Sequence, residues 1–369
     1  MSMPAKPCSP AGCPCQTSGG NPPSHGQLYM WFAAPHMRGK VVACAEKLQW
    51  TADTSSDDVD IVLTIAEEHG HPGTYQIFFD AFTSNERDDS RVLIVSDHRV
   101  PTLADAKSIE SLDKFLARQQ GHWLTKVIDD GQLKTQFQPI VAAHDPRHVV
   151  AHECLLRGID EDGAMINPGR MFDAARAAGL LFVLDAAARI TAVETANQMG
   201  VTSSIFINFT PTSIYDPTNC LKTTINAIDK TDLEREQFVF EVVESDRIDD
   251  MDHLANVLRE YRNNGFRVAL DDVGAGYSSL NLLPVLKPDF VKIDMGLIQG
   301  VHLDAVKAAV VERLIELAHD IGASVIAEGI ETQEELYWLT AKGVDLMQGF
   351  LLARPADAPV LSLDRRADK

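Results

Sequence analysis

From about residue 135 onward, short apolar runs of the chain alternate with amphipathic stretches. The strand-like runs are 135–141, 148–156, 204–209, 237–244, 267–272, 289–294, 324–330 and 345–352. Segments with helical periodicity, such as 169–179, 252–265 and 304–322, lie between most of them, and each of these three ends at a glycine, which is typical of a helix C-terminus. Strand–helix alternation predicts parallel strands joined by crossover helices. About eight such units over about 230 residues predict an α/β fold of the (β/α)8 barrel type.

The first two strands of this barrel are expected to depart from the pattern. Only residues 142–147 separate them, which is too short for a crossover helix. We therefore expect these two strands to pair as an antiparallel hairpin, which makes the barrel irregular at its start.

The region before the barrel differs in composition. Residues 59–66 and 74–82 each predict an apolar strand or a buried helix, and residues 91–97 predict a strand. The expected division is a Cys/Pro/Gly-rich tail (1–26), a small regulatory α/β module (27–110), a connecting helix (111–132), the barrel (133–360) and a C-terminal tail (361–369).

Charge and hydropathy narrow the range of partners. The 369 residues include 33 Lys+Arg against 53 Asp+Glu, a formal net charge of -20, which excludes duplex nucleic acid as a partner because such binding needs many basic contacts to phosphates. A small anionic ligand is still allowed where divalent metals invert the local charge. Neither a membrane-spanning run nor a signal peptide is seen, so we expect a cytoplasmic protein in which the six cysteines form no disulfide framework.

Polar side chains stand at the ends of nearly all the predicted barrel strands. They are Glu153, Asn208, Glu241, Asp271, Asp272, Lys292, Asp294, Glu328, Glu331 and Gln348. The carboxyl ends of barrel strands converge on one rim, where active sites are built. Carboxylate and amide oxygens without an accompanying His or Cys pair favour Mg or Mn over zinc.

The adjacent Asp271 and Asp272 need an explanation, because neighbouring carboxylates repel each other. Either they form a solvated turn, or cations lie between them. With the other carboxylates on the same rim, we favour two metals roughly 3.5–4 Å apart, an arrangement that activates water against phosphate esters. Lys292 would then steady that water or a phosphate oxygen, and Gly274 and Gly276 would let the following loop bend close to the site.

The segment ECLLR (153–157) resembles the Glu-x-Leu-x-Arg signature of EAL-domain phosphodiesterases, which hydrolyse the second messenger cyclic di-GMP to linear pGpG. The segments FQPIV, NFT, FEVVE, DDVGAGYSSL, VKID, AEGIE and QGFLLARP occur in the family's order over residues 135–357. The resemblance implies a homodimer that forms through the barrel and carries two Mg or Mn ions per site.

The resemblance also implies roles for individual residues. The implied metal ligands are Glu153, Asn208, Glu241, Asp271 and Asp272. Glu328 resembles the catalytic carboxylate that assists the attacking water, with Lys292 beside it. Gln138, Leu155 and Arg157 match substrate contacts, and Glu244, Asp294, Glu331 and Gln348 match supporting residues, Glu244 as the anchor of the loop that begins at Asp271. Departures such as Cys154, Val273 and Ala275 remove no implied metal ligand.

Several alternatives stay open. The chain could be a silent cyclic di-GMP receptor that signals through its N-terminal module, or an enzyme acting on another phosphodiester. Lys292 could instead form a structural ion pair with Asp294, and Cys154 is expected to be a small core residue. Cys8, Cys13 and Cys15, completed by Cys44 or His25, could hold zinc or an iron–sulfur centre, whereas an unstructured tail is an equal alternative.

Overall fold

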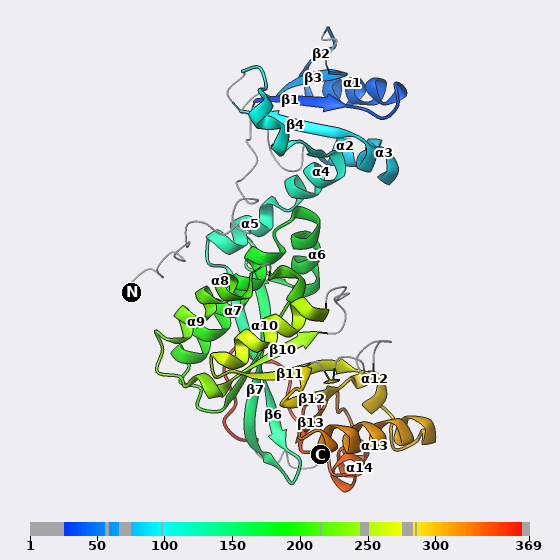
Figure 1. Cartoon of the computed structure of the whole chain (residues 1–369). Helices are drawn as coiled ribbons and strands as arrows, with labels where there is room; N and C mark the ends of the chain where they lie inside the picture. The colour runs from blue at the N-terminus through cyan, green and yellow to red at the C-terminus, as the bar shows by residue number, and fades with distance from the viewer. Residues whose placement is uncertain are drawn as a thin grey trace. The chain divides into compact units, whose positions relative to one another are not determined.

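The computed structural model describes residues 26–55, 59–65, 75–96, 99–214, 216–243, 251–274, 283–284 and 286–363 (Figure 1). The chain forms two compact units. Of the described residues, one unit contains 26–132 together with 160–184, and the other contains the barrel, residues 133–159 and 185 onward. Among the described residues, no helix combines the length and the apolar character needed to cross a membrane.

The N-terminal unit is built on a five-stranded sheet in the order β2-β3-β1-β4-β5, in which every pair is antiparallel. Its strands are β1 (Gly26–Trp31), β2 (Thr51–Asp53), β3 (Ile61–Ile65), β4 (Arg91–Val95) and β5 (Glu110–Ser111). Its other elements are α1 (His36–Leu48), α2 (Gln76–Ala81), α3 (Ser84–Asp89), η4 (Leu103–Ser108), α4 (Leu112–Gln120), α5 (His122–Asp129), β8 (Met165–Ile166) and α6 (Pro168–Ala178). The first four strands follow the β-α-β-β-α-β arrangement of ferredoxin-like folds, with two helices, α2 and α3, in the place of the second one.

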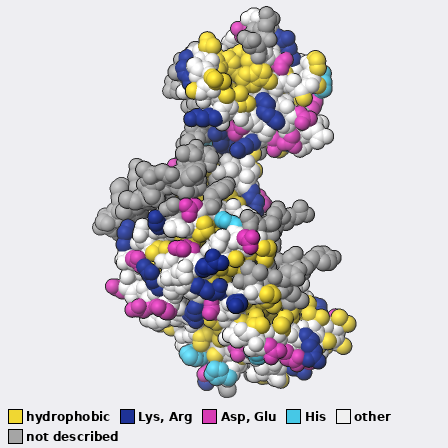
Figure 2. All heavy atoms as spheres, viewed as in Figure 1, with side chains coloured by type: hydrophobic (Ala, Val, Ile, Leu, Met, Phe, Trp, Pro, Cys, Tyr) yellow, Lys and Arg dark blue, Asp and Glu magenta, His cyan; other side chains and the backbone are white. Residues whose placement is uncertain are grey.

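Side-chain alternation explains how this sheet packs. Leu28 and Met30 of β1 enter a core shared with α1, α2 and α4, while Tyr29 lies on the opposite face with Val62 and Leu93. Figure 2 shows hydrophobic side chains gathered on this unit.

The structure decides between strand and helix for the apolar segments of this unit, and it divides the expected connecting helix in two. Residues 59–66 and 91–97 contain strands, whereas 74–82 contains the helix α2, whose Phe78 stacks on Trp50. Residues 111–132, expected to be one connecting helix, contain the two helices α4 and α5, which meet at Gly121. A Cβ on Gly121 would lie 2.9 Å from the Cβ of Ala178, so the chain turns there against α6.

The second unit is the predicted closed barrel. Its described strands are β6 (Leu133–Ala142), β7 (Asp145–Ile159), β9 (Ser204–Phe209), β10 (Phe238–Val243), β11 (Arg267–Val273), β12 (Phe290–Ile293), β13 (Ser324–Ala327) and β14 (Leu346–Met347). They follow the order β6-β14-β13-β12-β11-β10-β9-β7, and pairing of β7 with β6 closes the ring. The antiparallel hairpin is confirmed: β6 runs antiparallel to β7 and β14, and the other neighbours are parallel.

Helices and short 3-10 turns connect the barrel strands. They are α7 (Leu181–Gln198), η5 (Pro211–Ser213), α8 (Pro217–Cys220), α9 (Lys222–Ile228), η6 (Arg235–Gln237), α10 (Met251–Asn263), α12 (Met295–Ile298), α13 (Ala305–Asp320) and α14 (Gln333–Ala341). The predicted glycine ends are confirmed, since Gly179, Gly265 and Gly322 follow α6, α10 and α13 with positive φ. Asp304 begins α13 by accepting hydrogen bonds from the backbone N–H groups of Val306 and Lys307.

An apolar layer crosses the barrel interior, with one side chain from each strand. Its members are Ile140, Ala151, Phe206, Val239, Ala269, Phe290, Ile326 and, partly buried, Leu346. Phe206 and Phe290 meet edge to face with their ring centroids 5.1 Å apart. This layer forms the floor of the candidate site.

Candidate active site

A polar layer lies directly above the apolar floor. In a strand, residues two apart face the same side. In each parallel strand a polar residue follows the apolar-layer residue by two positions. In β6, which runs in the opposite direction, the polar residue precedes it by two positions. The eight side chains are Gln138, Glu153, Asn208, Glu241, Asp271, Lys292, Glu328 and Gln348. Residues spread over 211 positions of sequence (138 to 348) therefore form a single ring inside the barrel.

Lys292 is the centre of this ring, and its side chain is only 1% exposed. Its Nζ lies 2.7 Å from Oε1 of Glu241 and 3.0 Å from Oδ1 of Asp271. It also lies 2.7 Å from Oε1 of Glu328 and 3.7 Å from Oε2 of Glu153. Lys292 does not form the alternative ion pair with Asp294. The Asp294 carboxylate instead accepts a hydrogen bond from the backbone N–H of Gly296 at the start of α12.

Two amides orient the Glu153 carboxylate. Asn208 donates through Nδ2 to Oε1 of Glu153 (3.1 Å), and Gln348 donates through Nε2 to Oε2 (2.7 Å). Burial disfavours ionisation of Glu153, but the charge of Lys292 and these two donors outweigh it and lower the pKa of the carboxyl group. Glu153 is therefore held as an anion in a fixed orientation.

The other carboxyl groups of the ring are harder to ionise. Burial raises the pKa of Glu241 and that of Glu328 well above the usual range, and Lys292 offsets this only in part. The pKa of Lys292 is itself raised well above normal, because four neighbouring carboxylates outweigh the effect of burial. One ammonium group therefore cannot keep all of these buried carboxyl groups ionised.

A backbone irregularity in β11 turns the side chains of Asp271 and Asp272 toward the same site. Adjacent residues of a regular strand face opposite sides, but the pairing of β11 with β12 shifts register between Leu270 and Val273, and Asp272 has φ 55. Such a bulge re-aims a side chain. Burial, followed by repulsion from Asp271, raises the pKa of Asp272 to about 6.

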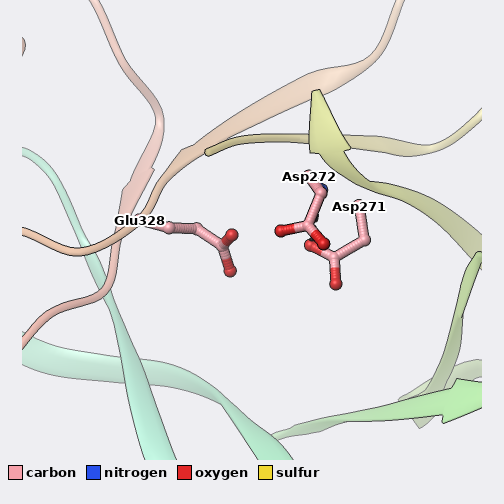
Figure 3. Close-up of side chains that lie close together, drawn as sticks. All are labelled: Asp271, Asp272 and Glu328. Carbon is pink, nitrogen blue, oxygen red and sulfur yellow. Dashed lines mark hydrogen bonds between the residues drawn. The ribbon is translucent and has the colours of Figure 1, made fainter. Parts of the chain in front are cut away.

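Three carboxylates from two strands consequently face one another. One oxygen each of Asp271, Asp272 and Glu328 lies within 4.8 Å of the other two, and Figure 3 shows Glu328 pointing toward both aspartates. These are hard oxygen donors suited to Mg or Mn.

Unsatisfied acceptors test whether a cation fits here. Oε2 of Glu241 and Oε1 of Gln348 are buried and have no hydrogen-bond donor among the described residues. A buried acceptor without a donor is costly, and a metal ion would satisfy both atoms. The donor set therefore fits divalent cations.

The predicted substrate contacts line the β6–β7 side of the site. Gln138 is cross-strand from Glu153, and its Nε2 donates to the carbonyl of Ala353 (3.3 Å). Leu155 is half-buried on β7. Arg157, also half-buried, donates from Nε to Oε1 of Gln136 (3.0 Å). Gln136 was missed by sequence reasoning, although its position two residues before Gln138 places both on one face of β6.

The remaining predicted residues lie apart from the ring or outside the described chain. The Glu331 side chain is exposed, and its backbone N–H donates to Oε2 of Glu335 (3.0 Å). Cys154 is buried, as expected for a core residue, and burial raises the pKa of its thiol well above normal. Cys44 is buried in the core of the N-terminal unit. The following predicted residues lie outside the described residues: Cys8, Cys13, Cys15, His25, Glu244 and Gly276.

The model of the EAL domain family matches residues 121–355. This match covers more than half of the chain, so the chain belongs to the EAL domain family, as the ordered motifs and the barrel topology had predicted.

Known relatives share this region. The chain is similar to the blue light- and temperature-regulated antirepressor BluF of Escherichia coli K12, with 29% identity over 221 residues, 59% of this chain and 53% of BluF. It is also similar to the probable cyclic di-GMP phosphodiesterase PdeG of the same strain, with 29% identity over 242 residues, 63% of this chain and 46% of PdeG. The chain thus spans about half the length of these relatives.

A solved structure has the same barrel. The standalone EAL protein from Vibrio cholerae O395, in its c-di-GMP-bound form, superposes with a TM-score of 0.57 and 33% identity. The match covers 62% of this chain and 95% of that protein.

Proposed function

We propose that this chain is a phosphodiesterase that hydrolyses cyclic di-GMP to linear pGpG with two Mg or Mn ions, and so lowers the level of the second messenger. The observation that carries the proposal is the charge of the ring. Lys292 is surrounded by the four ring carboxylates of Glu153, Glu241, Asp271 and Glu328. The Asp272 carboxylate lies beside those of Asp271 and Glu328, so four negative charges are uncompensated when all five are ionised. Two divalent cations carry the charge that would neutralise them.

The positions of the residues suggest which of them would bind each metal ion. Glu153, Asn208, Glu241 and Asp271 would hold one ion, and Asp271 with Asp272 would hold the second. Divalent ions bound there would activate a water molecule at neutral pH and would offset the negative charge of the phosphate.

Glu328 and Arg157 would act on the water and the substrate. Glu328 faces Asp271 and Asp272 across the site, where its carboxylate can accept the proton of the attacking water. The Arg157 guanidinium, with its Nε held by Gln136, leaves Nη2 for a phosphate oxygen. Lys292 keeps the carboxylates together before substrate arrives.

A silent cyclic di-GMP receptor is the second candidate function. It is favoured by the relative BluF, which is named an antirepressor rather than a phosphodiesterase. The two candidates differ in turnover, since a receptor would bind the same ligand without forming product.

The deciding experiment offers the metal-supplied full chain a panel of cyclic di-GMP, a linear diguanylate and other cyclic dinucleotides, and resolves the products by chromatography. The proposal predicts pGpG from cyclic di-GMP in preference to the others. Arg157→Ala should weaken substrate binding, while Lys134→Met, an exposed substitution on β6, serves as the control. Binding of cyclic di-GMP without product would establish the receptor, and cleavage of another dinucleotide alone would replace the substrate.

We also propose that the chain forms a homodimer through the barrel. The loop after β11 that the family resemblance points to lies mostly outside the described residues, but α13 offers an apolar groove lined by Ala305, Val306, Ala309, Val310, Arg313, Leu314 and Leu317. Val306 is 74% exposed and Val310 41%, and Figure 2 shows hydrophobic side chains over this helix. Exposed apolar surface of this kind favours a second copy as its partner. The cytoplasmic location expected from the sequence remains a prediction.

A further inference from the structure

A buried ion pair outside the catalytic ring has no part in the reaction described above. Asp185 and Arg189 lie one turn apart on α7, with side chains 2% and 0% exposed, and Oδ2 of Asp185 lies 3.1 Å from Nη2 of Arg189. The buried neighbours Leu184, Ala192 and Val193 on the same helix are apolar. A buried pair of charges usually gains little stability over apolar residues of similar size, so its position calls for another explanation.

The Asp185 carboxylate is fastened to the turn that follows β9. Its Oδ1 accepts the backbone N–H of Thr210 (2.8 Å), and its Oδ2 accepts the hydroxyl of Ser213 (3.0 Å). The N–H of Ser213 in turn donates to the carbonyl of Thr210 (3.0 Å). One side chain therefore fixes both ends of the 3-10 turn η5.

Thr210, the residue that precedes this turn, is two residues after Asn208. Asn208 is the β9 member of the ring, and it holds Oε1 of Glu153 through its amide. Because Thr210 is tied to Asp185, the backbone that leaves β9 cannot rotate freely, and the direction of the Asn208 side chain is set with it. Partners that orient a metal ligand commonly influence metal affinity as strongly as some ligands do.

Arg189 contacts Oδ2 of Asp185, the same oxygen that accepts the hydroxyl of Ser213. Its Nη1 donates to the hydroxyl of Tyr261 on α10 (3.1 Å), and the Tyr261 ring stacks on Phe240 with centroids 4.2 Å apart. Burial raises the pKa of Asp185, and the charge of Arg189 offsets this only in part. The contacts thus run from Asp185 through Arg189 to Tyr261.

We propose that Asp185 is a positioning residue for the metal site: it fixes the turn after β9 so that Asn208 presents its amide oxygen to the cation. This inference rests on the proposed function, because it assumes that Asn208 is a metal ligand.

The test measures Mn2+ affinity directly, by electron paramagnetic resonance of free Mn2+ in titrations of the metal-stripped full chain. The double variant Asp185→Ala/Arg189→Met removes both charges together, so no lone buried ion is left. We expect its Mn2+ affinity to fall about tenfold, with turnover recovering when Mn2+ is raised in proportion. Tyr261→Phe is the matched control: it keeps the ring stacking, removes one buried hydrogen bond of the same network, and should leave Mn2+ affinity unchanged even if it lowers the melting temperature.

The outcomes separate the positioning role of Asp185 from the proposed function of the chain. Equal Mn2+ affinity in the folded double variant and the wild type would overturn the positioning role, and so would an equal loss in Tyr261→Phe. If the double variant does not fold, Ser213→Ala decides: a measurable loss of Mn2+ affinity supports the inference, and an unchanged affinity overturns it. Failure of the wild type itself to bind Mn2+ would instead defeat the proposed function.

Discussion

Removing the charge of Lys292 is the sharpest perturbation of the site, because its ammonium group contacts four carboxylates in the barrel interior. Lys292→Met keeps the unbranched shape of the side chain, one atom shorter, and deletes the charge. Breaking a buried ion pair by removing one partner typically costs about 3–5 kcal/mol. With three contacts of 3.0 Å or less, we expect a cost in that range for the metal-free protein. For a domain of this size it corresponds to a fall of about 6–20 °C in melting temperature.

The response to metal makes this prediction specific. Lys292→Met keeps all the predicted ligands and adds one uncompensated negative charge, so added Mn2+ should raise its melting temperature by more than it raises that of the wild type. Calorimetry in EDTA and in Mn2+ measures both shifts, with Lys134→Met as the exposed-lysine control. A variant as stable as the wild type in EDTA would show that Lys292 does not hold the ring together. A smaller Mn2+ shift in the variant would refute the charge argument.

Four further substitutions probe other parts of the account. Asp271→Asn should lower Mn2+ affinity by at least about tenfold and abolish turnover; wild-type titration curves would remove Asp271 from the ligand set. Glu328→Gln should bind cyclic di-GMP but turn it over about 10²–10⁴-fold more slowly, whereas lost binding in a folded variant would assign it to the ligand shell. Val310→Asp should convert the dimer to a monomer in light scattering, and a persistent dimer would place the interface elsewhere. Cys154→Ala should leave the rate unchanged in steady-state assays, and a large loss of rate would give the thiol a function.

The barrel and the positions of its polar side chains could be predicted from sequence because both depend on local periodicity. Alternation of strands and helices predicts the topology, and the short link 142–147 predicts the antiparallel start. The ring follows from the same period of two: Glu241 stands two residues after Val239, and Asp271 two after Ala269. The roles assigned to these residues stay predictions.

Features that depend on tertiary contacts could not be predicted. The pattern gives no sign that Asp272 adopts a positive φ, since this depends on the register between β11 and β12. Nor does it show that Lys292 contacts four carboxylates from separate strands. The buried Asp185 and Arg189 did leave a signal, two opposite charges four residues apart in an apolar helix, but their partner Thr210 is set by the fold.

The central claim is that the ring binds two divalent cations that are required for turnover. The most direct test strips the full chain of metal, titrates Mn2+ in the presence of cyclic di-GMP, and measures bound Mn2+ and pGpG formation in the same samples. We predict no product in EDTA and a rate that reaches its maximum when two Mn2+ are bound per chain. Full turnover in EDTA, or a maximal rate with a single ion bound, would contradict the account.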